Sequence, residues 1–298
     1  AYDPLTESFI LSHPYSDDAP FHVIYFCGSP SAIQHLSVDQ NKLIFLDVAN
    51  NENLSFFSCS NNELDTLDLT GCNALKTVIA SVNELRSIDI SHLEYLELLQ
   101  LDYNKELTHA EISNHQYLHT LDIGNSGIKN LTLSDNPNLA YLFLEKVDLD
   151  TLNGLPVDGS NFNFADLTAL KELDVAETKF ITSLDISNNP YLSLLNITYS
   201  QINRLNISNG AIAIVFANGS KLKDLIYTPS KILNLYNLNI IGTPFEREES
   251  PLYTFFTSGL PDRSHSDQKG YLYISTPLQP VITALIPYLE KKNWEVRQ

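Results

Sequence analysis

Apolar residues recur along this chain in a pattern that repeats every 21 or 22 residues. Leu54, Leu75 and Leu96 each open a block that follows L-x-x-L-x-L-x-x-N-x-L-x-x-L-D-L or a close variant of it. The leading apolar positions keep this register along most of the chain and are Ile33, Leu54, Leu75, Leu96, Leu118, Leu139, Leu170, Leu192, Ile212 and Leu235. Such a period predicts a solenoid, in which each coil buries its apolar face against the next coil.

Each repeat contains two similar halves, and both halves have the spacing of a short strand. In one repeat the two apolar triplets are Leu54, Phe57 and Cys59, then Leu64, Leu67 and Leu69. The last two members of each triplet are two residues apart, which is strand periodicity. A half-repeat of about 10 residues is too short for a multi-turn helix. The sequence therefore predicts a β-rich solenoid with one well-paired parallel sheet, extended segments opposite it, and little helix except at the C-terminal end.

The turn that follows the first strand carries a recurrent polar residue. Asparagine occupies this place in four consecutive repeats, at Asn41, Asn62, Asn83 and Asn104. An asparagine side chain can bond to the backbone of a turn and tolerates unusual dihedral angles. We therefore expect a ladder of stacked side chains, which weakens where later repeats place Ser126, Val147, Thr178 and Ser200.

This pattern resembles that of the leucine-rich-repeat family, and the match is nearly letter for letter from Leu54 to Leu69. The short form, with repeats of about 21 residues, is similar to secreted or surface proteins of gut and oral Bacteroidetes and, more distantly, to internalins. The resemblance covers Ile33 to Thr243. It implies a right-handed coil with a parallel sheet on the concave face and ligand binding on that sheet. It implies no catalytic residue.

The pattern divides the chain into an N-terminal cap at residues 1–32, a solenoid of about ten repeats at 33–244 and a C-terminal cap at 245–298. The first cap contains the apolar run Phe21–Cys27. The second contains a polar break at Phe245–Pro251, a strand at Gly270–Ser275 and a helix from Thr276 to Trp294 that is broken at Pro287. A small separate ligand-binding domain is the alternative interpretation of this last segment. An insertion near 153–164 is either a tolerated surface loop or part of a binding face.

Composition and charge limit the possible partners. The formal net charge of −18 disfavours nucleic acid and anionic membrane surfaces as partners, although it also serves solubility. No apolar stretch is long enough to span a bilayer. Cys27, Cys59 and Cys72 have no metal-like spacing, and we expect no disulfide framework. The chain contains no Met, so we expect a processed form from which a signal peptide has been removed, located outside the cell or at a bacterial surface.

Side chains between the core positions of the first strand point outward and form columns across the stacked coils. Two features stand out in these columns: an apolar patch on the N-terminal coils, which also includes Val82, and aromatic residues beside acids in the middle coils. Such aromatics can anchor a basic or polar partner, or stack on sugar rings. The expected ligand-binding residues are Phe56, Ile79, Leu98, Asp102, Tyr103, Asp122, Tyr141, Phe143, Glu145, Glu172 and Asp174.

Metal and catalytic sites are not expected. An acidic residue recurs near the end of most second halves, but a calcium site needs six to eight converging oxygens, so we interpret this residue as an exposed strand position. His109, His115 and His119 fall in different parts of the repeat and should diverge. The sequence contains no G-x-S-x-G elbow, phosphate loop or dinucleotide fingerprint. We therefore expect no enzyme activity, cofactor or metal.

The sequence favours a non-enzymatic binding protein that recognises a protein or glycan partner through the concave face of a leucine-rich-repeat solenoid. The alternative is a structural or scaffold module of a cell-envelope assembly without a single ligand. Removing the acidic and aromatic side chains of the middle coils would separate the two, because only the first function depends on them.

Overall fold

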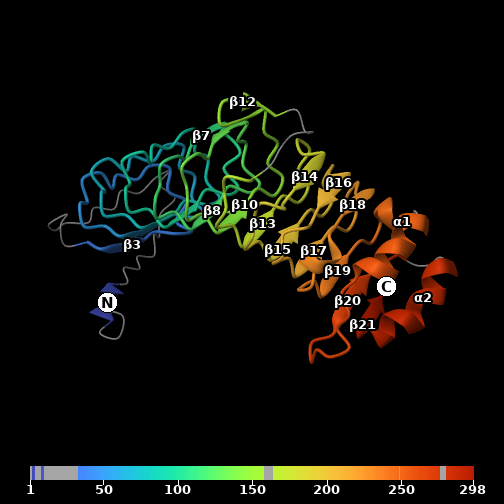
Figure 1. The fold of residues 1–298 in the computed structure, drawn as a ribbon. Helices are drawn as coiled ribbons and strands as arrows, with labels where there is room; N and C mark the ends of the chain where they lie inside the picture. The colour runs from blue at the N-terminus through green and yellow to red at the C-terminus, as the bar shows by residue number, and fades with distance from the viewer. Residues whose placement is uncertain (1, 4–7, 10–32, 158–163, 248, 276–279) are drawn as a thin grey trace.

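One long parallel sheet organises the molecule. The computed structural model describes residues 2–3, 8–9, 33–157, 164–247, 249–275 and 280–298. Twelve strands within these ranges form a sheet in the order β3-β4-β5-β6-β8-β10-β13-β15-β17-β19-β20-β21. Figure 1 shows this sheet along the inner side of a curved arch. The order follows the chain, so each coil adds one strand beside the strand of the coil before it.

The strands of this main sheet are short. They are β3 (His35–Ser37), β4 (Phe56–Ser58), β5 (Thr77–Ile79), β6 (Leu98–Gln100), β8 (Thr120–Asp122), β10 (Tyr141–Phe143), β13 (Glu172–Asp174), β15 (Leu194–Asn196), β17 (Ile214–Phe216), β19 (Asn237–Asn239), β20 (Gly270–Tyr273) and β21 (Trp294–Arg297). All neighbouring pairs are parallel. In most of these strands the middle side chain is buried and the two beside it are half-buried, which gives each coil one residue layer inside and one outside.

The second halves of the repeats lie on the outer side of the arch. There β7 (His109–Glu111), β9 (Asn130–Thr132), β11 (Thr151–Leu152) and β12 (Leu155–Pro156) form one sheet, and β14 (Ser183–Asp185), β16 (Arg204–Asn206) and β18 (Asp224–Ile226) form another. The described residues of the earlier coils form no such sheet there: they have an isolated bridge between Asp47 and Asp68 and single backbone hydrogen bonds such as that from the Asn50 N–H to the Thr70 carbonyl. The predicted parallel solenoid with weaker extended segments opposite is therefore confirmed (Figure 1).

The insertion in the middle of the solenoid begins with a hairpin. Strands β11 and β12 pair antiparallel around Asn153 and Gly154, which have φ of +50° and +74°. Two consecutive positive φ values are typical of a tight hairpin turn, and Asn-Gly is the sequence that favours it. The remaining part of the predicted insertion, residues 158–163, lies outside the described residues. The hairpin separates the two outer sheets, whereas the main sheet continues from β10 to β13.

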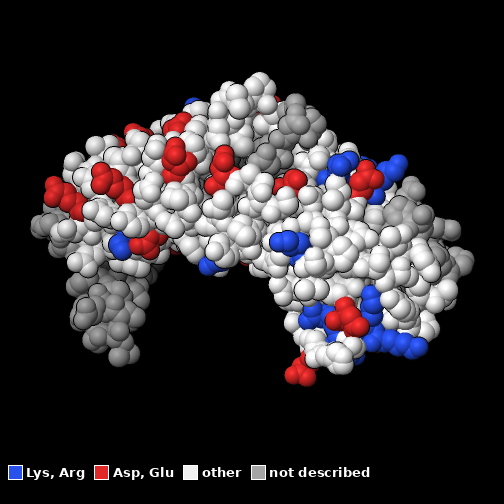
Figure 2. All heavy atoms as spheres, viewed as in Figure 1, with Lys and Arg blue, Asp and Glu red and all other residues white. Residues whose placement is uncertain are grey.

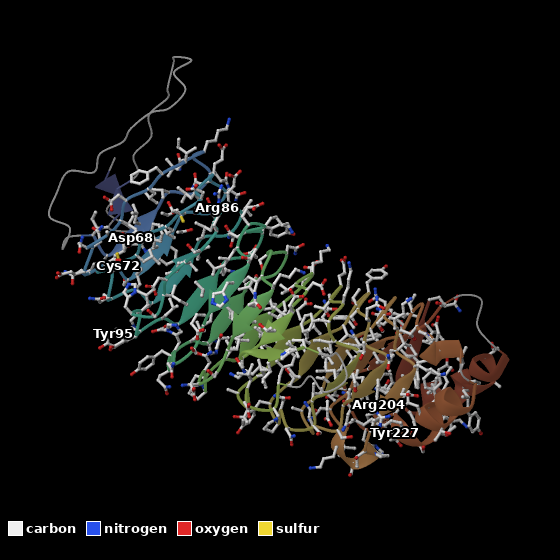
Figure 3. The ribbon with its side chains drawn as sticks, turned by 90° about the horizontal axis from the view of Figure 1, so that it is seen from above. Asp68, Cys72, Arg86, Tyr95, Arg204 and Tyr227 are labelled. Carbon is white, nitrogen blue, oxygen red and sulfur yellow. The ribbon has the colours of Figure 1, made fainter. Side chains whose placement is uncertain are left out.

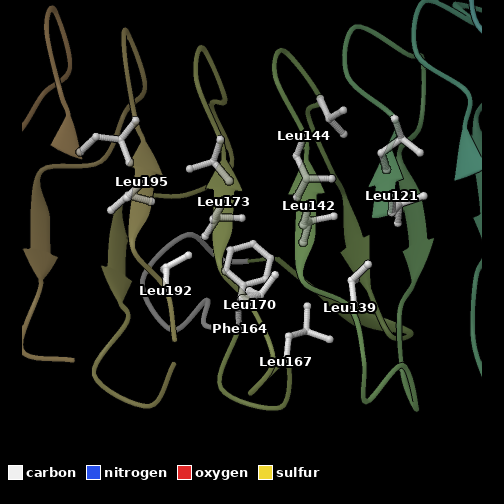
Figure 4. Close-up of a cluster of buried hydrophobic side chains, with 14 of the residues drawn as sticks. Leu121, Leu139, Leu142, Leu144, Phe164, Leu167, Leu170, Leu173, Leu192 and Leu195 are labelled. Carbon is white, nitrogen blue, oxygen red and sulfur yellow. The ribbon is translucent and has the colours of Figure 1, made fainter. Parts of the chain in front are cut away.

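The space between the two sides is filled by the apolar positions of the repeat. Leu54, Leu75, Leu96, Leu118, Leu139, Leu170, Leu192, Ile212 and Leu235 are all fully buried. Figure 4 shows how the rows continue from coil to coil, with Leu142, Leu173 and Leu195 side by side. Each coil thus buries its own residues against its two neighbours, which is why a single repeat has no core of its own.

The predicted asparagine ladder is confirmed, and its hydrogen bonds explain why asparagine occupies this position of the repeat. The Asn62 side chain accepts the backbone N–H groups of Asn41 and Leu43 at 3.0 Å each. Its amide nitrogen donates to the carbonyl oxygens of Val38 at 2.9 Å and Cys59 at 2.8 Å. One side chain therefore satisfies backbone groups of two consecutive coils. Asn83 and Asn104 repeat the arrangement, and Asn136 does the same at an outer turn. Asn189 repeats only the donating half, from its amide nitrogen to the carbonyls of Phe164 and Leu167.

A second feature of the turn was not predicted. The third residue after the end of the main-sheet strand has a left-handed backbone conformation in nearly every coil. These residues are Gln40, Asn61, Val82, Tyr103, Asn125, Lys146, Glu177, Tyr199, Gly219 and Gly242, with φ between +54° and +74°. Gly and Asn adopt this conformation readily, but Val82 is β-branched and is disfavoured there. The stacked coils impose the conformation whichever residue occupies the position.

The two ends depart from the simple repeat. At the N-terminus only an antiparallel pair, β1 (Tyr2–Asp3) and β2 (Ser8–Phe9), is described, so the predicted cap with its run Phe21–Cys27 lies outside the described residues. At the C-terminus β20 confirms the predicted strand and extends the main sheet. The sheet therefore continues through the segment that the sequence assigns to the C-terminal cap, and that domain boundary stays a prediction.

Two expectations for the C-terminal helix are wrong, and the segment before it forms short helices. The predicted polar break contains η3 (Phe245–Arg247) and the start of α1 (Glu249–Thr254), and a π-helix, η4 (Phe255–Gly259), follows. Helix α2 (Pro280–Lys291) runs through Pro287. A proline inside a helix removes one backbone hydrogen bond, and the hydrogen bonds of the turns on either side keep this helix continuous. Trp294 belongs to strand β21, which pairs with β20. The Trp294 indole donates to the Pro261 carbonyl at 2.9 Å and is buried, so tertiary packing selects a strand here.

Candidate functional site

The concave face of the main sheet presents continuous columns of side chains. Cα pairing places Phe56, Thr77, Leu98, Thr120, Tyr141, Glu172 and Leu194 in one column, and Ser58, Ile79, Gln100, Asp122, Phe143, Asp174 and Asn196 in the next. Both columns are the ones that the sequence predicts. Alternate residues of a strand face opposite sides, so the residue between the two columns points into the core. The face is built of rigid, stacked strands, which hold its side chains in fixed relative positions.

An acidic pocket of about 110 Å³ opens at the C-terminal ends of four of these strands, β6, β8, β10 and β13. Four carboxylates line it, from Asp102, Asp122, Glu145 and Asp174. Its other lining residues are Tyr103, Gly124, Asn125 and Phe143. The pocket exists partly because Gly124 has no side chain: a Cβ there would lie 3.2 Å from the Asp122 Oδ1.

The charge of this pocket is largely uncompensated. Lys146 lies 3.3 Å from Glu145 and 3.1 Å from Glu177, so it neutralises the rim. In the described part of the chain, no Lys or Arg pairs with the other three carboxylates. Asp174 instead accepts the Ala176 N–H at 2.8 Å and the Asn196 amide at 2.8 Å. A cation from outside would find carboxylates that the fold itself leaves without one.

The pKa values report this crowding. Burial, and after it the nearby carboxylates of Asp102, Asp174 and Glu145, together raise the pKa of Asp122 to about 6, against a hydrogen bond from the Gly124 N–H that lowers it. Burial and Glu145 also raise the pKa of Asp174, and burial and Asp174 raise that of Glu172. Each group would ionise more easily beside a positive charge, so the pocket favours a cationic ligand over an anionic one.

Next to the acidic pocket lies a larger hollow, which we call the tyrosine groove. It has a volume of about 410 Å³ and is open to solvent on one side. The sheet contributes Tyr141, Leu194 and Ile214, and the turns before β15 and β19 contribute Tyr191 and Tyr236. Its remaining lining residues are Lys171, Glu172, Ser193 and Ala213. Strands β10 and β13 contribute to both cavities, so the groove and the pocket are neighbours on one face.

The eleven predicted binding residues separate into three groups. Six line the acidic pocket: Asp102, Tyr103, Asp122, Phe143, Glu145 and Asp174. Tyr141 and Glu172 line the tyrosine groove. Phe56, Ile79 and Leu98 lie half-buried on β4, β5 and β6 and line neither cavity, and Val82 beside them is 40% exposed. The Phe56 ring is covered by His35, whose ring centroid is 4.0 Å away. A binding role for these eleven residues stays a prediction.

Sequence reasoning missed several lining residues. Gly124 carries no chemistry of its own and acts by leaving space. Tyr191 and Tyr236 precede their strands and belong to turns, so the column rule does not select them. One sequence signal could have identified the two tyrosines, because a tyrosine recurs in the turn before the strand. It also occurs there at Tyr95 and Tyr117, whose ring centroids lie 6.0 Å apart. Figure 3 shows Tyr95 at one flank of the solenoid and Arg86 at the other.

Charge is distributed unequally along the solenoid. Residues 1–170 contain 24 acidic and 6 basic residues, whereas residues 171–298 contain 12 of each. The face in Figure 2 shows the same division, with acidic side chains over the N-terminal half and most Lys and Arg towards the C-terminal end. The acidic pocket therefore lies in the negatively charged half, whose field attracts a basic partner over several ångströms.

Other candidate chemistry is dispersed. The three histidines diverge as predicted: His115 is buried with its Nδ1 3.3 Å from the Leu93 carbonyl, His109 is exposed on β7, and His119 lies against Tyr141. Cys59 and Cys72 are free, buried thiols, and Cys27 lies outside the described residues. Within the described ranges, no group of three His, Cys, Asp or Glu side chains is arranged to hold a metal ion. The same ranges contain no helix with the length and apolar character of a membrane span.

Comparison with known proteins supports the fold. A leucine-rich-repeat protein of Leptospira interrogans superposes with a TM-score of 0.59 at 18% identity, over 90% of this chain and 78% of that one. The functional domain of InlJ from Listeria monocytogenes is 20% identical, with a TM-score of 0.45 and coverage of 89% and 63%. An internalin of the same species is 15% identical, with a TM-score of 0.31 and coverage of 72% and 82%.

This chain spans less than two thirds of the InlJ domain. No protein-family model matches the sequence, and no curated protein matches it. The Leptospira protein shares the leucine-rich-repeat solenoid, and at such low identity the likeness concerns the fold alone. Function must therefore be argued from the concave face itself.

Proposed function

We propose that this chain is a binding protein that recognises a polypeptide partner on its concave face, with a Lys or Arg side chain of the partner in the acidic pocket. The observation that carries the proposal is the pocket of four carboxylates, three of which have no cationic partner in the described part of the chain. Phe143 beside them offers aromatic surface to the stem of such a side chain, whereas the Tyr103 ring already has the Lys105 ammonium 5.6 Å from its centroid.

The proposal includes a location. We place the protein outside the cell or at a bacterial surface, in keeping with the resemblance of its repeats to surface leucine-rich proteins. Binding rather than catalysis is proposed because recognition needs only a rigid face with a few anchoring side chains. A scaffold module without a single ligand is the competing function, and it makes no use of the acidic pocket.

The test compares two variants with the same change in charge. Asp122→Asn/Asp174→Asn neutralises the acidic pocket, whereas Glu111→Gln/Asp185→Asn neutralises two exposed residues on the outer sheets. The probes are two fluorescein-labelled Gly-Ser peptides, one with an Arg pair and one with an Asp pair. Their affinities are measured by anisotropy at 150 mM NaCl.

We expect the Arg peptide to bind the wild-type chain and the Asp peptide not to bind. The pocket variant should lose at least about tenfold in affinity, and the outer variant less than about twofold, because the pocket gathers four carboxylates around one hollow and neither Glu111 nor Asp185 lines it. Equal losses in both variants would mean that binding follows net charge alone, and the assignment of the pocket would then be wrong.

A further inference from the structure

The tyrosine groove has a different chemistry from the acidic pocket beside it. The sheet beneath it contributes Leu194 and Ile214, and Ala213 comes directly before β17. Three tyrosines bound it, and Tyr191 is 64% exposed. Apolar side chains of the partner would bury their surface against this lining, whereas sugar hydroxyls would lose water there without gaining partners from Leu194 and Ile214.

The groove also has polar lining residues, Lys171, Glu172 and Ser193, besides its three tyrosines. The Ser193 hydroxyl already donates to the Lys171 carbonyl at 3.2 Å. Tyr236 is held from behind by the Arg263 guanidinium, 5.7 Å from its ring, and Tyr141 is held by His119, 4.9 Å away. These contacts orient the rings and leave a groove of about 410 Å³, a volume within the range of pockets that bind small molecules.

The two cavities are offset diagonally on the sheet. The acidic pocket uses residues at or just after the ends of β6, β8, β10 and β13, and the groove uses residues at or just before the starts of β10, β13, β15, β17 and β19. Their centres are therefore separated by two to three strands, about 12 Å at ~4.8 Å per strand, and by about three residues along the strands, ~10 Å. The diagonal is about 15 Å, which an extended chain covers in four to six residues at ~3.3 Å each.

We propose that the groove holds a large apolar or aromatic side chain of the same polypeptide whose basic side chain enters the acidic pocket, four to six residues away in either direction. This inference rests on the proposed function and adds a recognition motif to it. Charge complementarity decides which end of the segment lies in the pocket, and apolar burial decides which end lies in the groove.

A peptide series tests the spacing. The probes are fluorescein-labelled Gly-Ser peptides that carry one Trp and one Arg pair, with one to nine residues between them, and a control in which Trp is replaced by Ser. Each is titrated to millimolar protein at 150 mM NaCl. We expect an affinity maximum at an offset of four to six residues, about tenfold tighter than the Ser control.

Two groove variants keep the result interpretable. Ile214→Arg fills the groove with charge, and Tyr191→Ala removes an exposed ring, so neither changes the core. Both should abolish the effect of Trp while leaving the affinity for the Ser control unchanged. Affinities that ignore the offset, or a Trp effect that survives in Ile214→Arg, would overturn the inference.

The outcomes separate this inference from the proposed function. If the Ser control binds through the pocket but Trp adds nothing, the groove assignment fails and the proposed function stands. If a peptide with Trp alone binds through Ile214 and the Arg pair adds nothing, the pocket fails instead. Binding of glycans from an array to the wild-type chain, lost in Ile214→Arg, would assign the groove to a carbohydrate and overturn the inference.

Discussion

Asp122→Asn should stabilise the folded chain at neutral pH while it weakens binding. The Asp122 carboxyl has a pKa of about 6, against an ordinary value of 3.8, mainly because of burial and then because of Asp102, Asp174 and Glu145. In the unfolded chain the proton leaves near pH 3.8, and in the folded chain near pH 6. Between these values the folded state binds more protons, so the free energy of unfolding falls as the pH rises.

The magnitude follows from this difference. A gap between 3.8 and about 6 corresponds to at most about 3 kcal/mol at pH 7. The side chain is partly exposed, and solvent screening reduces the figure to ~1–2 kcal/mol. Asparagine keeps an oxygen that can accept the Gly124 N–H at 3.0 Å and carries no charge, so it removes the penalty without opening a cavity.

The assay is urea unfolding followed by circular dichroism at several pH values. The variant should exceed the wild type in free energy of unfolding by ~1–2 kcal/mol above pH 7, and the two should converge below about pH 4. Most of the difference should survive 1 M NaCl, because burial contributes more than the neighbouring charges.

Asp185→Asn on β14 is the control. Burial alone would raise the Asp185 pKa, but hydrogen bonds from Ser187 and Asn206 outweigh it and lower the value. Here the folded state holds its proton less tightly, so the wild-type residue stabilises the fold above its unfolded pKa, and this contribution is lost as the pH falls. Asparagine should therefore give no gain at neutral pH. A gain equal to that of Asp122→Asn, or no gain from Asp122→Asn at pH 7, would refute the reasoning.

Three further outcomes are expected. Asn104→Ala should lower the free energy of unfolding by ~2–4 kcal/mol in urea titrations, because it removes the side-chain partners of the buried Leu85 N–H and Leu101 carbonyl, whereas the exposed Asn41→Ala should cost under ~1 kcal/mol. Equal costs would contradict the ladder. Val82→Asn should raise the free energy of unfolding by ~1 kcal/mol, because Val82 has a φ of +56° that Asn tolerates better. A lower free energy of unfolding in this variant would show that the exposed Val82 side chain stabilises the fold. Anisotropy should show the Arg-pair peptide binding up to about fourfold more weakly at pH 5.5 than at pH 7.5, as Asp122 becomes protonated, and a flat profile would exclude Asp122 from the contact.

The repeat pattern by itself determined the architecture and the division between inside and outside. An apolar residue at every leading position leaves one way to bury all of them, so the columns of buried Leu and the facing columns of outward residues follow from spacing alone. The asparagine ladder was predictable for the same reason: the side chain meets the needs of a turn that recurs in every coil. These features depend on interactions between neighbouring repeats, and such interactions repeat with the sequence.

Only the tertiary structure decided where the concave face is hollow. Gly124 opens the acidic pocket because its neighbours on both sides carry long side chains. Tyr141, Tyr191 and Tyr236 meet in one groove because the insertion after β10 leaves the main sheet unbroken. Strand β21 formed where helical spacing was expected, since β20 offered it a free edge. Each outcome depends on the lengths of intervening segments and on what lies across the gap, which no local pattern specifies.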